Sequence, residues 1–221
     1  VHTISSGAVE SMCLIPDGTR GEREVLYLVI RTAGGTRQIE VLDVDFPIAS
    51  VELDWLSKPF VDSYKVVNGT TGVLTGLSHL EGREVAIVDY DFQTTATVVG
   101  GQVDVSPTVL SATAIVGLKY TAELKSVPLE TGSVTGSGRG HTGRIDEVGV
   151  VLHRSVNFYY YDSGRYKVKH SPNSTLTLFT GTTKVRMFNS YELDQVVELV
   201  VEDPYPFYLG GLAIDHKTNE Q

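Results

Sequence analysis

Short β-branched runs separated by glycine turns are the feature that most limits how this chain can fold. Valine, threonine and tyrosine are abundant, alanine-rich stretches are absent, and glycine recurs at short intervals along the 221 residues. Valine, threonine and tyrosine favour strands, whereas glycine permits tight turns and weakens helices. The sequence therefore predicts an all-β fold of sandwich or barrel-like β-domains with few or no helices.

Length and charge narrow the class of protein further. A chain of 221 residues can form one large all-β domain or two smaller ones with their own cores. The net charge is -9, and an acidic surface repels phosphate, which disfavours tight binding of nucleic acid but allows DNA to pass close by without being held. No stretch approaches the roughly 18 unbroken apolar residues of a membrane helix, so we expect no membrane-spanning segment.

The N-terminal region carries two further signals. The single cysteine, Cys13, lies within an apolar run, so no intrachain disulfide can form, and we predict a small buried hydrophobic residue. The chain begins at Val1 with neither an initiator methionine nor the architecture of a signal peptide. We therefore expect it to start within a longer protein.

Turn signals divide the chain into four predicted segments. Residues 1–69 form a β-rich segment with a hairpin around Gly34-Gly35, and residues 70–130 form a small β-barrel or sandwich unit. Residues 131–143 are a flexible loop rich in glycine, serine and threonine. Residues 144–221 form a β-rich C-terminal block, and the pattern allows its strands to pair with those of residues 1–69.

Residue types that support catalysis are scattered along the chain. No two of the six histidines fall at a spacing that suits metal ligands. The pairs Asp43/Asp45 and Asp89/Asp91 each share a strand face, which suits a Ca²⁺ ligand set or a glycosidase pair. Neither pair has the pattern of a calcium loop, so we interpret both as solvated strand ends. We predict no catalytic, cofactor-binding or metal-binding residues and no enzymatic activity.

Aromatic side chains and the glycine-rich loop supply the candidate interaction residues. Successive side chains of a strand point to opposite faces, so two residues of an aromatic run should be buried and two exposed or at a subunit contact. The predicted subunit-interface residues are Trp55, Phe158, Tyr159, Tyr160 and Tyr161. The predicted flexible tip or gate consists of Gly136, Gly138, Arg139, Gly140 and His141.

Several segments in order resemble one known family. They are Phe60–Ser63, Gly76–Val85, Gly100–Gly101, Val116–Glu130, Arg144–Ile145, Leu178–Gly181 and Asp203–Phe207. Together they are similar to the C-terminal part of the tail nozzle proteins of short-tailed bacteriophages, also called tail tubular protein B. The resemblance spans about residues 24 to 215, and Gly76–Gly82 and Val116–Glu130 are its most specific parts.

The resemblance implies a structural role in the virion tail. It implies a ring of identical copies, expected to be a hexamer, through which the genome is ejected into the host. It implies no catalysis and no cofactor. The expected partners are other copies of the chain, a tail adaptor protein, tail fibres or spikes, and genomic DNA that passes through without sequence-specific binding. Family members are longer than this chain, which agrees with the expectation drawn from its N-terminus.

Two other functions are compatible with the same β composition. A carbohydrate-binding or host-adhesion β-module of a virion or secreted protein would use Trp55 or Tyr159–Tyr161 as stacking platforms. A secreted hydrolase would need a cleft with one of the two aspartate pairs. Glycan binding by the isolated chain would indicate the first, and loss of activity on substitution of the aspartates would indicate the second.

Overall fold

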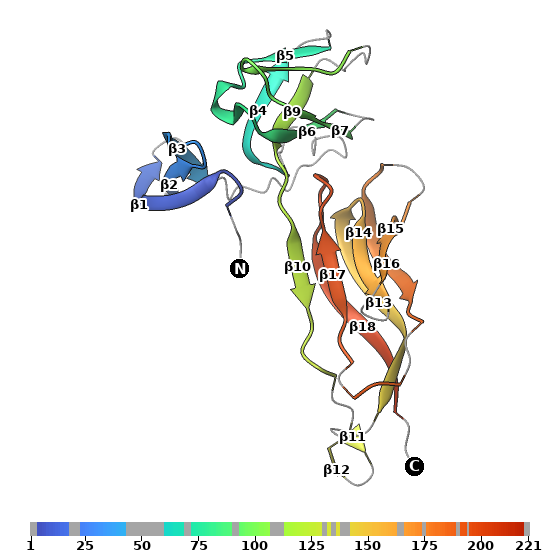
Figure 1. Cartoon of the computed structure of the whole chain (residues 1–221). Coiled ribbons are helices and arrows are strands. Elements are labelled where there is room, and N and C mark those ends of the chain that lie inside the picture. Colours follow the sequence, from blue (N-terminus) through green and yellow to red (C-terminus); the bar gives the residue numbers. More distant parts are fainter. Residues whose placement is uncertain are drawn as a thin grey trace. The chain divides into compact units, whose positions relative to one another are not determined.

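A computed structural model shows two compact units, Val1–Tyr120 and Thr121–Gln221 (Figure 1). The described residues are 4–17, 23–42, 60–68, 72–89, 93–106, 113–129, 132–133, 136–137, 142–162, 166–173, 176–188, 191–193 and 195–218. They form antiparallel sheets, with a short 3₁₀ turn at Ser78–Leu80. The predicted all-β class is therefore confirmed.

The first unit begins with a three-stranded sheet in the order β1–β2–β3. Its strands are β1 (Gly7–Asp17), β2 (Arg23–Thr32) and β3 (Arg37–Leu42). β2 and β3 form the predicted hairpin, in which Gly35 adopts a φ of 81° and the Thr32 amide donates to the Thr36 carbonyl over 2.9 Å. Glycine reaches a positive φ without a Cβ clash, which is why this turn needs it. β1 pairs with β2 and bulges between Val9 and Ser11.

A barrel-like body follows within the same unit. β4 (Asp62–Asn68), β9 (Thr113–Leu118), β6 (Glu84–Val88) and β7 (Gln93–Thr97) form one sheet in that order, and β5 (Val73–Thr75) pairs with β8 (Gln102–Asp104). β6 and β9 are almost wholly buried, as expected of interior strands with continuous apolar runs. The core consists of Leu74, Leu77, Leu80, Val85, Ile87, Val98, Val103, Ala114, Val116 and Leu118.

The second unit is a β-sandwich. One sheet has the order β10 (Ala122–Lys125), β17 (Glu198–Val201), β14 (Phe158–Asp162) and β15 (Tyr166–His170). The other has the order β16 (Phe179–Arg186), β13 (Gly143–Ser155) and β18 (Leu209–Thr218). Both sheets contribute to the core, which consists of Ile145, Val148, Val150, Leu152, Phe158, Val185, Met187, Val197 and Leu199.

Strand pairing differs from the predicted segments in two respects. β1–β3 pair among themselves and β4 pairs with β9, so no described strand of residues 1–69 pairs with one of residues 144–221. β10 lies in the segment assigned to the small 70–130 unit, yet it pairs with β17 of the second unit. The four residues of β10 are all exposed, so they carry no burial pattern that could have indicated their partner.

Two smaller features complete the fold. β11 (Gly132–Ser133) and β12 (Gly136–Ser137) pair with each other inside the segment predicted as a glycine-rich loop. Among the described residues, no helix has the length and apolar character needed to cross a membrane.

Candidate functional site

The β1–β3 sheet exposes apolar side chains on both of its faces. Directly paired residues share a face, so Met12 and Leu14 lie on the face of Leu28, whereas Ile39 lies on the face of Tyr27. Met12, Leu14 and Ile39 are 71%, 60% and 72% exposed. The exposed set, here called the apolar sheet surface, is Val9, Met12, Leu14, Ile15, Ile39, Val41 and Leu42. Large exposed apolar side chains gathered on one sheet are typical of a contact with another molecule.

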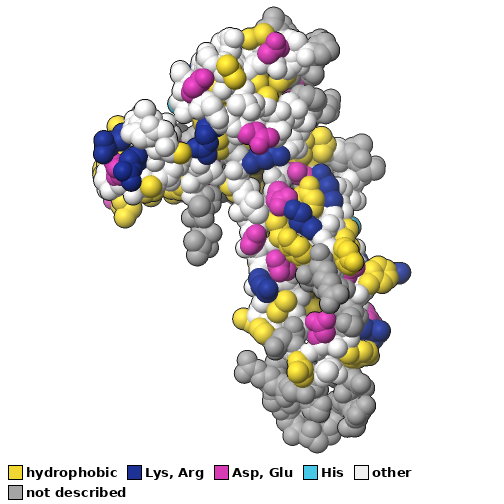
Figure 2. All heavy atoms as spheres, in the orientation of Figure 1, with side chains coloured by type: hydrophobic (Ala, Val, Ile, Leu, Met, Phe, Trp, Pro, Cys, Tyr) yellow, Lys and Arg dark blue, Asp and Glu magenta, His cyan; other side chains and the backbone are white. Residues whose placement is uncertain are grey.

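Three charged side chains near the hairpin turn of this sheet pair with one another. The Glu10 carboxylate lies 2.6 Å from Arg37 and 3.4 Å from Arg31. The hydrogen bond from Arg37 lowers the pKa of Glu10, and the same bond raises the pKa of Arg37. Figure 2 shows basic and acidic side chains beside hydrophobic ones over β1–β3. The Glu10 carboxylate is therefore compensated by two guanidinium groups beside the apolar sheet surface.

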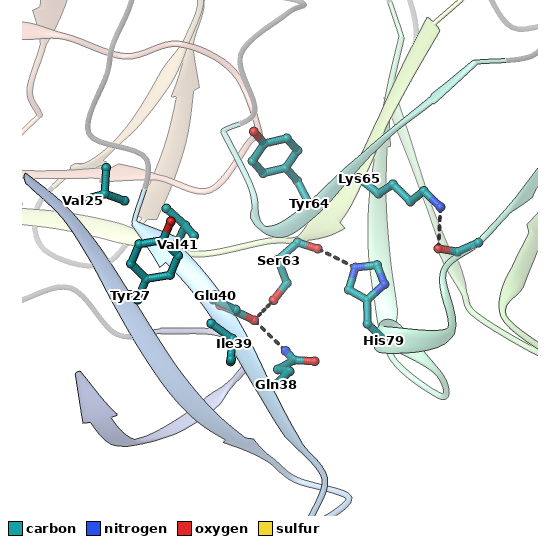
Figure 3. A pocket seen from close by; sticks show the side chains of 11 residues that line it. Val25, Tyr27, Gln38, Ile39, Glu40, Val41, Ser63, Tyr64, Lys65 and His79 are labelled. Carbon is teal, nitrogen blue, oxygen red and sulfur yellow. Dashed lines mark hydrogen bonds between the residues drawn. The ribbon is translucent and has the colours of Figure 1, made fainter. Parts of the chain in front are cut away.

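A groove of about 730 Å³ runs beside β3 (Figure 3). Its apolar lining comes from β2 and β3 and consists of Val25, Tyr27, Ile39 and Val41. The opposite wall belongs to the barrel-like body and includes Tyr64 and Lys65 of β4 and His79 of the 3₁₀ turn. The groove therefore combines an apolar wall and a polar wall within the first unit.

The polar groups of the groove already bind one another. The Glu40 carboxylate accepts hydrogen bonds from Ser63 Oγ and, over 2.6 Å, from Gln38 Nε2. His79 Nε2 lies 3.0 Å from the Ser63 carbonyl oxygen, and Lys65 Nζ donates to the Gly76 carbonyl over 2.9 Å. Figure 3 shows that the Ser63–Glu40 bond crosses from the barrel-like body to β3, whereas the other three bonds each lie within one wall. The Ser63–Glu40 bond therefore links the two walls of the groove.

β3 is an outer strand of its sheet at this groove. Among the described strands its only partner is β2, so one side of β3 carries backbone groups without a strand partner. Such an edge can accept a further strand by backbone hydrogen bonding. β1 is the other outer strand of the same sheet, and its only described partner is also β2.

A glycine turn links two segments that carry the family resemblance. The Glu81 carboxylate accepts hydrogen bonds from the amides of Gly100 over 2.9 Å and Gly101 over 2.7 Å. Both glycines have a positive φ, 63° and 70°, as a type I′ turn requires. The Leu77 amide donates to the Gly101 carbonyl over 2.9 Å. Hydrogen bonds therefore hold the segments Gly76–Gly82 and Gly100–Gly101 against each other.

The predicted alternation of the aromatic run is present in β14. Phe158 is fully buried and Tyr160 packs against the same core, while Tyr159 and Tyr161 lie on the opposite face of the strand. Lys167 and Lys169 lie 5.1 Å and 5.5 Å from the Tyr159 ring centroid. Burial, and then the charge of Asp203, raises the pKa of Tyr159, which matches its hydrogen bonds to the Asp203 carboxylate.

The aromatic run does not present an open stacking platform at Tyr159, because two lysine side chains lie over its ring. Its predicted role as a subunit interface stays a prediction. Trp55, the other predicted interface residue, lies outside the described residues.

Most of the predicted tip also lies outside the described residues. Gly136 belongs to β12, whereas Gly138, Arg139, Gly140 and His141 are not described. Of the two aspartate pairs, only Asp89 is described, and it is buried. In the described part of the chain, no three His, Cys, Asp or Glu side chains are grouped so that they could hold a metal ion.

Two features of the site differ from, or go beyond, the sequence predictions. Cys13 is exposed, not buried as predicted, because β1 is an outer strand of a sheet with exposed apolar side chains on both faces. The apolar run Met12–Ile15 indicated a strand that is buried on both faces. The sequence did not indicate whether this chain or another molecule buries it. Glu81 was not singled out, and its position next to Gly82 in the glycine-bounded turn was the available signal.

No protein-family model matches the sequence, and no curated protein matches it. The resemblance to tail nozzle proteins therefore depends on the residues named above.

Proposed function

We propose that the chain is a structural component of a bacteriophage tail and forms part of the ring-shaped nozzle through which the genome is ejected. The observation that carries the proposal is the bond between Glu81 and the Gly100–Gly101 turn. It joins two resemblance segments that are separate in sequence. Two segments that are hydrogen-bonded to each other in the fold have a physical reason to appear in the same sequence. This contact therefore supports reading the two segments as parts of one resemblance.

A ring of copies also accounts for the apolar sheet surface. Seven large apolar side chains from β1 and β3 are exposed in the single chain. Burial of apolar surface stabilises association by about 25 cal/mol per Å². In the proposed assembly other copies of the chain cover this surface. A hexamer is the proposed copy number, with the tail adaptor protein and tail fibres or spikes as further partners.

The charge of the chain suits a channel that DNA crosses without being held. Each copy carries a net charge of -9, and negative charge repels the phosphate backbone. We therefore expect no retained DNA in a fluorescence anisotropy titration at low salt. Tight binding that weakens steeply with salt would contradict this part of the proposal.

The mass of the intact assembly tests the proposal most directly. Light scattering should give six copies, and end-on images of the assembly or of virion tails should show a closed ring with six-fold symmetry. The same preparation would be applied to a panel of immobilised glycans, where we expect no binding. A monomer in solution, with no six-fold density at a tail, would overturn the proposal, and a monomer that binds a glycan would indicate the adhesion module.

A further inference from the structure

We infer that β1 of one copy pairs with the outer edge of β3 in the next copy, within the groove beside β3. The inference rests on the proposed ring and names the contact that would build it. The copies would then be joined head to tail through one continuous sheet.

The two strands are complementary because they are opposite edges of the same sheet. Among the described residues, β1 and β3 each have a strand partner on one side only. Unpaired backbone groups on two such edges satisfy each other when the edges meet. A contact between two different surfaces of identical chains is heterologous, and it closes into a ring when the rotation permits.

Apolar side chains match across the same contact. Within β1, Met12 and Leu14 lie on one face, and Cys13 and Ile15 lie on the other. In the groove, Ile39 and Val41 of β3 are exposed on the face that corresponds to Cys13 and Ile15. A strand placed beside β3 therefore buries its own apolar side chains and those of the groove wall together.

Charge favours a second copy as the occupant. A chain with a net charge of -9 repels its own copies wherever charged surfaces meet. Met12–Ile15 carries no charge, and the nearby Glu10 is paired with Arg37 and Arg31. The uncharged segment Met12–Ile15 therefore lets two copies of the acidic chain come into contact with little charge repulsion. A nucleic acid or an anionic membrane would be repelled by the acidic chain as a whole.

Ring symmetry fixes the direction and the face of the pairing. β1 and β3 are both antiparallel to β2, so they run in the same direction. Rotation about a ring axis along the strands preserves that direction, so the neighbour's β1 runs parallel to β3. Rotation also keeps each face of the sheet on the same side. The neighbour's Cys13 therefore lies on the face of Ile39 and Val41, opposite to that of Leu42.

Cys13 provides a direct test, because it is the only cysteine of the chain and it is exposed. Neighbouring strands lie about 4.8 Å apart, within the Cα separation of about 4.4–6.8 Å that a disulfide needs. Val41→Cys and Ile39→Cys place a second thiol on β3 at two positions along the predicted face. Mild oxidation followed by a non-reducing gel should give a ladder of linked chains beyond the dimer in at least one variant. Leu42→Cys, on the same strand but the opposite face, is the matched control and should give no ladder.

The outcomes separate the inference from the proposed function. Light scattering under reducing conditions first establishes whether each variant assembles, and circular dichroism establishes that it folds. A ring that forms in both β3 variants without a ladder would overturn the inference and leave the proposed function intact. Linked dimers of the unsubstituted chain would indicate antiparallel β1–β1 pairing instead, which also overturns it. A chain that stays monomeric would overturn both.

Discussion

Single side chains hold the backbone turns of the first unit in place. Glu81 accepts two amide hydrogen bonds from Gly100 and Gly101, and both glycines have a positive φ. Ser63 also has a positive φ, 49°, and its hydroxyl donates to Glu40 across the groove. A residue other than glycine in this conformation is strained, so the surrounding contacts must maintain it.

Removing the Glu81 carboxylate should destabilise the first unit. Glu81→Ala leaves two turn amides to be satisfied by water, so we expect the free energy of unfolding to fall by about 1 kcal/mol. Urea denaturation measures the change. Glu84→Ala, which removes an exposed carboxylate three residues away, is the control and should cost about 0.5 kcal/mol or less. Equal losses in the two variants would contradict the role of Glu81.

The second unit should lose stability in mild acid because of His170. Its Nε2 lies 2.7 Å from Thr183 Oγ1, and burial lowers the pKa of His170 below its ordinary value of 6.5. As the pH falls through 6.5, the unfolded chain therefore binds the proton first. The stabilisation is present above that pH and is lost as the pH falls towards the lower folded pKa.

Urea denaturation at about pH 7.5 and about pH 5 measures this effect. His170→Gln keeps a hydrogen-bonding side chain but cannot titrate in this range, so its stability should depend less on pH. The same pH dependence in both proteins would show that His170 is not the responsible group.

Individual strands contain side chains with opposite roles. In β14, Phe158 packs against Phe207 and His170 with ring centroids 5.7 Å and 5.2 Å apart, while Tyr159 lies under two lysines on the other face. In β1, by contrast, both faces carry exposed apolar residues. β14 contributes to the core of the sandwich, whereas β1 needs a further partner to bury its apolar side chains.

Two substitutions in β14 should separate these roles. Phe158→Ala should lower the free energy of unfolding by about 3–5 kcal/mol, because a fully buried aromatic ring leaves a cavity. Tyr161→Ala, on the other face of the same strand, should cost about 1 kcal/mol or less. Denaturant titrations of both variants measure the difference, and similar losses would mean that the run does not alternate as described.

The whole molecule consists of two units, each with its own core. Both sheets of the sandwich and all of its core residues lie within residues 121–221. The apolar sheet surface, in contrast, belongs to the first unit. We therefore expect the second unit to fold without the first, and changes to the apolar sheet surface to affect assembly without affecting the fold of the second unit.

A chain of residues 121–221 should fold by itself. We expect a single cooperative urea transition, because this range contains every described strand of the sandwich. A shorter chain that begins at residue 127 lacks β10 and is the comparison; it should be less stable, since β17 loses the pairing with β10. A longer fragment without a cooperative transition would contradict the independence of this unit.

A charge on the apolar sheet surface should prevent assembly without unfolding the chain. Leu14 is 60% exposed, so Leu14→Lys should change the free energy of unfolding by about 0.5 kcal/mol or less while light scattering shows monomers. Thr97→Lys, an exposed position on the outer strand β7, is the control and should assemble normally. Assembly of the Leu14→Lys variant would show that copies meet elsewhere.

Local sequence patterns were sufficient for the fold class and for several elements. The β-branched runs predicted strands, Gly34-Gly35 and Gly100-Gly101 predicted turns, and alternation along β14 predicted that its rings lie on two opposite faces. These features depend on backbone preferences and on side-chain direction within a few residues. They can therefore be inferred without knowing what lies next to them.

The tertiary structure alone decided which distant segments meet. It paired β10 with β17, brought Glu81 to the Gly100–Gly101 turn, and set the groove between β3 and β4. It also left Cys13 exposed within an apolar run. The physical reason is that burial and hydrogen bonding between distant segments depend on the whole chain's packing. An apolar run shows that a strand needs cover, but only the three-dimensional arrangement shows whether the chain itself supplies it.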